Sequence, residues 1–141
     1  MPSDKALIDA YFTKAKENYG LALLSVSSEP RRYNGAASRM YYAVFQAIIA
    51  RLALKGISAD KAREICGRSA GDREDQWRHD VVTDKITLAQ AGISTPMEQR
   101  KVIDLRNQRI IADYKAVSAD PADVIDNLRF VGELLQGLGV I

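Results

Sequence analysis

The sequence has very few of the residues that most often build metal and cofactor sites. It contains one cysteine, Cys66, and one histidine, His79, in 141 residues. A single cysteine excludes an internal disulfide and a cysteine-rich zinc cluster, and a single histidine excludes a histidine-rich metal site. Gly-rich phosphate loops and the Gly-x-Ser-x-Gly elbow are also missing. We therefore expect no metal and no cofactor.

Long apolar runs and a strong net charge are missing too. No stretch approaches the roughly 18 apolar residues of a membrane helix, and the N-terminus MPSDKALIDA has no basic region before an apolar core. These features predict a cytoplasmic protein that does not enter a membrane. The formal net charge of +2 is too small to indicate nucleic-acid binding by itself, although 12 of the 20 cations are arginine.

The sequence does contain apolar residues at spacings of three and four over nearly its whole length. This spacing is typical of amphipathic helices, and no segment alternates with the period of two that a strand requires. The length suits one domain. We therefore predict a single all-α domain over residues 1–141, an antiparallel up-and-down helical bundle with about five to six helices.

Local signals divide the chain into these helices. The predicted segments are a first helix ending before SSEP (27–30), a second over about 31–55, a short third over about 58–65, a fourth from 77 to near 92, a fifth from 96, and a last one that begins within DPAD (120–123), a cap followed by proline. Gly56 is a stop signal, Ser58 a cap, and Thr95, Pro96 and Glu98 form a strong start signal. CGRSAGDREDQ (66–76) is the most loop-like stretch.

The stretch LRNQRIIADY (105–114) places polar residues within the fifth predicted helix. Arg106, Arg109 and Asp113 lie at spacings of three and four, so they share one face, and Arg109 can pair with Asp113. Asn107 adds donors, and Tyr114 adds a ring. The simplest interpretation is an exposed ion pair worth under about 1 kcal/mol. The alternative is a functional site bordering the core.

A second string of polar residues and the single histidine are further candidates for a binding or catalytic site. Arg39, Tyr42 and Gln46 form a second polar string at spacings of three and four, beside the apolar stripe of the second helix. Such a string is commonly a helix edge, and a lone histidine such as His79 is more often structural than catalytic. The sequence alone leaves both alternatives open.

Three of these segments together resemble a HEPN domain, the small helical domain named for higher-eukaryote and prokaryote nucleotide binding. They are AASRMYYAVFQAIIARLALKG (36–56), WRHDVV (77–82) and LRNQRIIADY (105–114), and the resemblance covers about residues 5–137. It implies an up-and-down helical bundle that usually dimerises. Many members are metal-independent ribonucleases of toxin–antitoxin or antiviral systems, and others are non-catalytic partners of small nucleotidyltransferases.

The family's catalytic signature is an arginine and a histidine separated by four to six residues. Arg106 is followed at those positions by Ile111, Ala112 and Asp113, and Arg109 also lacks the histidine. Metal-free RNA cleavage needs a base, an acid and cations for the phosphorane. Arginines supply only the last of these. His79 could substitute as the missing group from the fourth predicted helix.

Three readings follow from the resemblance. The first is an RNA- or nucleotide-binding homodimer with weak or no nuclease activity, in which arginines bind phosphate and Tyr42 or Tyr114 stacks a base. Its expected binding residues are Arg39, Tyr42, Gln46, Asn107, Tyr114 and His79. The second is a structural or regulatory partner of a nucleotidyltransferase or another protein. The third is a metal-independent endoribonuclease in which Arg106, Arg109 and Asp113 are catalytic.

Overall fold

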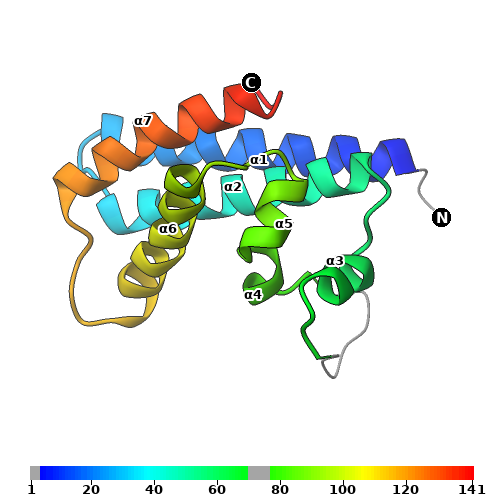
Figure 1. Cartoon of the computed structure of the whole chain (residues 1–141). Helices are drawn as coiled ribbons and strands as arrows, with labels where there is room; N and C mark the ends of the chain where they lie inside the picture. Colours follow the sequence, from blue (N-terminus) through cyan, green and yellow to red (C-terminus); the bar gives the residue numbers. More distant parts are fainter. Residues whose placement is uncertain (1–3, 70–76) are drawn as a thin grey trace.

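The chain folds into helices, as the apolar spacing predicts. The computed structural model describes residues 4–69 and 77–141, and no strand occurs within those ranges. They contain seven helices, namely α1 (Asp4–Ser27), α2 (Tyr33–Leu54), α3 (Ala59–Ile65), α4 (His79–Val82), α5 (Lys85–Gln90), α6 (Pro96–Tyr114) and α7 (Pro121–Gly137) (Figure 1). The prediction of an all-α helical fold is confirmed.

Helix α2 is the centre of the protein. It forms an antiparallel pair with α1, and α6 and α7 pack against it from other sides (Figure 1). Its buried residues include many alanines, which let neighbouring helices approach closely. The buried positions of α2 are Ala36, Ala37, Met40, Tyr41, Ala43, Val44, Ala47, Ile48, Ile49, Ala50 and Leu52. Every element that contributes to the site described below contacts α2.

The residues predicted to begin and end helices do so in the structure. Thr95 caps α6 by accepting from the Glu98 N–H at 3.2 Å, and Pro96 occupies the first helical position. Ser58 caps α3 by accepting from Lys61 N–H. Gly56 ends α2 with a φ of +71°, a conformation that glycine adopts without strain. These local contacts fix where the helices begin and end.

The helix count differs from the prediction of five to six. The fourth predicted helix is two helices, α4 and α5, which are separated at Thr83 and Asp84. The Asp84 carboxylate accepts from the Ile86 N–H at 2.9 Å and so starts a new helix within an apolar pattern that continues across the break. The loop predicted at 66–76 lies mostly outside the described residues, which resume at Trp77.

Within residues 4–69 and 77–141, no single helix is both long and apolar enough to cross a membrane. By length and composition alone, only α2 and α3 taken together reach that limit, and they are bent by 92° relative to each other. Half of the residues of α2 are buried against the other helices of the protein.

Candidate functional site

Arg109 is a buried cation at the contact between α6 and α2. Only 8% of the residue is exposed, so the interpretation of 105–114 as a solvated helix edge is wrong for Arg109. Its Nη1 donates to the Tyr42 hydroxyl at 2.9 Å. Its Nε is buried without a hydrogen-bond partner, and its Nη2 donates to no described residue. Burying a charge without full pairing is costly, so this arrangement needs an explanation.

Three tyrosine rings surround the Arg109 guanidinium. Its central carbon lies 5.4 Å from the ring centroids of both Tyr41 and Tyr42, and 5.6 Å from that of Tyr114. Each distance suits a cation–π contact, which stabilises the buried charge in part. Tyr114 is itself 72% exposed and makes no hydrogen bond to a described residue, so one of the three rings faces solvent.

His79, the first residue of α4, joins the same cluster. Its Nδ1 lies 2.6 Å from the Tyr41 hydroxyl, and its ring stacks on Phe45 with centroids 4.6 Å apart. Burial, followed by the Arg109 and Arg106 charges, lowers the pKa of His79 from its ordinary value of 6.5, against the opposing charge of Asp80. His79 is therefore neutral near pH 7.

The Tyr41 hydroxyl determines which nitrogen of His79 carries the proton. Burial raises the pKa of Tyr41 to about 12, so its hydroxyl remains protonated. The hydroxyl then donates to Nδ1, because an unprotonated imidazole nitrogen is an acceptor. In the neutral ring the remaining proton is on Nε2, and His79 presents an N–H donor there.

Arg106 brings a second guanidinium to the cluster from one turn earlier on α6. Its Nη1 donates to Thr83 Oγ1 at 3.2 Å, and Thr83 Oγ1 donates in turn to the His79 carbonyl at 2.6 Å. No described carboxylate lies within ion-pair distance of Arg106. The charges of Arg106 and Arg109 both lower the pKa of His79, and both oppose the rise in the pKa of Tyr41.

Asp113 balances this positive charge only in part. Its Oδ2 lies 3.7 Å from Arg109 Nη1, which is too long for a hydrogen bond, and accepts from Ser38 Oγ at 3.3 Å. The Asp113 side chain remains 30% exposed. One distant carboxylate therefore faces two guanidiniums, and the cluster has an excess of positive charge.

The remaining predicted binding residues make different contacts, and not all of them reach Arg109. Arg39 and Gln46 both bond to Asn18 of α1, at 3.2 Å and 2.8 Å, so they crosslink α1 and α2. Tyr42, which shares their helix face, instead reaches Arg109. Asn107 is exposed on α6. Of the predicted residues, the structure brings Arg106, Arg109, Asp113, Tyr42, Tyr114 and His79 into one cluster.

Sequence reasoning missed Tyr41, Thr83 and Ser38. Tyr41 lies on the buried face of α2 and is only 1% exposed. Its hydroxyl partner is 38 residues away in the sequence, so helical spacing gives no signal for this contact. We call the group of Arg106, Arg109, His79, Tyr41, Tyr42, Thr83, Asp113 and Tyr114 the arginine cluster.

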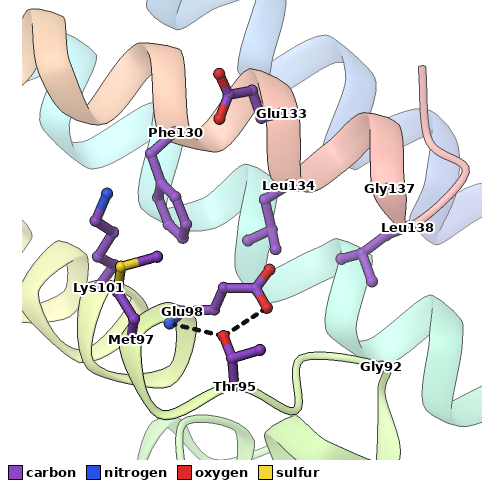
Figure 2. Close-up of a pocket in the computed structure, with 10 residues that line it drawn as sticks. All are labelled: Gly92, Thr95, Met97, Glu98, Lys101, Phe130, Glu133, Leu134, Gly137 and Leu138. Carbon is purple, nitrogen blue, oxygen red and sulfur yellow. Dashed lines mark hydrogen bonds between the residues drawn. The ribbon is translucent and has the colours of Figure 1, made fainter.

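A separate hollow of about 370 Å³ lies between the start of α6 and α7 (Figure 2). Phe130 and Leu134 point into it from α7, and the Lys101 ammonium lies 4.9 Å from the Phe130 ring centroid. Thr95 and Glu98 close its lower side through their capping bonds. None of its lining side chains has a buried polar atom without a partner. The arginine cluster is therefore the stronger candidate site.

The described residues offer little for a metal ion. Within 4–69 and 77–141, no three His, Cys, Asp or Glu side chains gather as metal ligands. The arrangement is instead suited to an anion, since it presents two guanidiniums and one neutral N–H donor.

Comparison of the chain with family models found no match, and comparisons with curated proteins and with solved structures found none of significance. The resemblance to HEPN domains therefore remains a prediction, and the geometry of the arginine cluster is the main guide to function.

Proposed function

We propose that this chain is a HEPN-like domain that binds RNA or a nucleotide through Arg106 and Arg109. The supporting observation is that Arg109 is 8% exposed and that the carboxylate paired with it, Asp113, lies 3.7 Å from Nη1. A fold retains a poorly paired buried cation at a cost, and an anionic ligand would compensate for that cost. Phosphate suits such a site, because its oxygens form strong charge-assisted hydrogen bonds with guanidinium groups.

The surface beside the arginine cluster is compatible with nucleic acid and with a second copy of the chain. Tyr114 offers an exposed ring on which a base can stack. Near it in the sequence, the apolar residues Ile111 and Val117 are 40% and 67% exposed. The proposed homodimer, and a role in a toxin–antitoxin or antiviral system, come from the resemblance to HEPN domains.

A binding assay in EDTA tests this proposal. Pure protein is incubated with mixed RNA and with nucleotides, and retention is compared for wild type, Arg109→Met and Arg100→Met. Arg100 is exposed on the same helix as Arg109 and belongs to no ion pair with a described residue, so it is a matched control. We expect Arg109→Met to abolish retention and Arg100→Met to leave it nearly unchanged. Equal retention by all three proteins would reject the proposal.

Metal-independent RNA cleavage is a second candidate function, favoured by the position of His79. The structure brings the only histidine of the chain beside two arginines, although none follows either arginine at the family's spacing. As a base, His79 would need an unprotonated nitrogen, and Nδ1 already accepts from Tyr41. Cleavage therefore requires the proton to move from Nε2. RNA products ending in 2′,3′-cyclic phosphate, formed in EDTA and lost in His79→Asn, would establish this activity.

A further inference from the structure

We propose that the arginine cluster takes a phosphomonoester, the dianionic end of a nucleotide or of an RNA strand, in preference to an internal phosphodiester. This inference rests on the proposed function, in which phosphate binds at Arg106 and Arg109. It adds the chemical form of the phosphate, which determines whether the site binds the end of a chain or its middle.

Arg109 lies below the surface of the protein, with 8% of the residue exposed. The guanidinium lies among the rings of Tyr41, Tyr42 and Tyr114, and its Nε is closed off. The group that remains free of hydrogen bonds to described residues and is not fully buried is Nη2. An internal phosphodiester carries a sugar on each side, and both sugars would have to enter with it. A terminal phosphate enters on one stem, so it reaches a recessed cation more easily.

The number of hydrogen-bond donors in the arginine cluster also favours a phosphomonoester. A phosphodiester has two non-bridging oxygens, which two guanidiniums would satisfy. A phosphomonoester has three terminal oxygens, and the cluster provides a third donor in the Nε2–H of His79, whose Nδ1 is held by Tyr41. Thr83 supports the arrangement, because its hydroxyl bonds both Arg106 and the His79 carbonyl. Arg106, Arg109 and His79 together therefore offer three donor groups, one for each terminal oxygen of a monoester.

Charge gives the two kinds of phosphate different binding signatures. A monoanionic diester together with Asp113 would already balance Arg106 and Arg109. A dianionic monoester leaves one negative charge in excess, which protonation of His79 would neutralise. The charged or titratable groups that face His79 are Arg106 and Arg109 from α6, Asp80 from its own helix, and Tyr41 and Tyr42 from α2. Monoester binding should therefore take up a proton, and diester binding should not.

The test compares ligands that differ only in the phosphate. Affinities are measured by calorimetry for AMP, for the dinucleoside monophosphate ApA, for inorganic phosphate, and for one RNA oligonucleotide with a 5′-phosphate, a 3′-phosphate or neither. We expect the phosphate-terminated forms to bind about tenfold or more tightly than ApA and the unphosphorylated strand, as one further charge-assisted hydrogen bond implies. AMP binding without strand binding would identify the ligand as a nucleotide, and preference for phosphorylated strands would identify an RNA end.

Variants separate this inference from the proposed function. Arg109→Met and Arg106→Gln should both remove the preference for terminal phosphate, whereas Arg100→Met should keep it. Arg106 is only half-buried, so Arg106→Gln remains informative if Arg109→Met does not fold. Equal, arginine-dependent affinity for phosphorylated and unphosphorylated strands would overturn the inference and leave the proposed function intact. Affinities that neither arginine variant alters would overturn both.

Discussion

The Tyr41 hydroxyl and His79 Nδ1 lie 2.6 Å apart, which joins the central helix α2 to the first residue of α4. Because Tyr41 is 1% exposed, this contact holds the imidazole at the edge of the core and directs its other nitrogen away from Tyr41. The contact also decides that His79 acts first as a donor, which is why the cluster is better suited to holding an anion than to removing a proton.

Tyr41→Phe tests this relationship. The hydroxyl donates to the neutral imidazole, so its loss should raise the pKa of His79. Proton NMR titration measures this directly, since His79 is the only histidine and its ring signals need no assignment among others. Tyr11→Phe, on α1, is the control and should leave the titration unchanged. A pKa of His79 that does not rise in Tyr41→Phe would show that Tyr41 does not stabilise the neutral ring.

The stability of the protein should depend on pH through His79. The pKa of His79 is lowered in the folded protein from an ordinary value of 6.5, so the unfolded chain binds the proton more readily. Stability from this group is present above pH 6.5 and is lost as the pH falls through 6.5 toward the lower folded pKa. Urea unfolding at pH 7.5 and pH 5.5 should therefore show a smaller loss of stability on acidification in His79→Asn than in wild type. An equal loss in both proteins would contradict this account.

Arg109→Met separates a functional arginine from a structural one. Methionine keeps an unbranched apolar side chain and removes the buried charge, and replacing a poorly paired buried ion by an apolar side chain is often neutral or stabilising. We expect the free energy of unfolding to stay within about 1 kcal/mol of wild type or to rise, while phosphate binding is lost. Chemical denaturation measures the first, with Arg100→Met as control. A loss of several kcal/mol would instead indicate that Arg109 serves the fold.

Asp113→Asn should strengthen the binding of a phosphate ligand. Its carboxylate competes with the ligand for Arg109, at 3.7 Å from Nη1, and repels a phosphate. Removing the charge should tighten binding by up to about fivefold, in line with the 1 kcal/mol or less of such a partly exposed pair. Asp104→Asn, exposed on the same helix, is the control. If Asp113→Asn instead weakens a dimer without changing ligand affinity, Asp113 is part of an interface.

Particular residues show what the sequence could and could not predict. Helix ends at Thr95, Ser58 and Gly56 depend on contacts with close neighbours along the chain, so the sequence alone predicted them. The break at Asp84 was missed because the apolar spacing continues across it. In the site, the shared face of Arg106, Arg109 and Asp113 followed from helical geometry. The burial of Arg109 did not, because it depends on rings from α2, and the position of His79 depends on how α4 reaches α2.

A crystal structure of the protein grown with AMP would test the central claim most directly. The account predicts a phosphate within hydrogen-bond distance of Arg109 Nη2, with Arg106 and His79 as its other donors and Asp113 turned away from Arg109. AMP bound elsewhere on the surface, with Arg109 still bonded only to the Tyr42 hydroxyl, would contradict it.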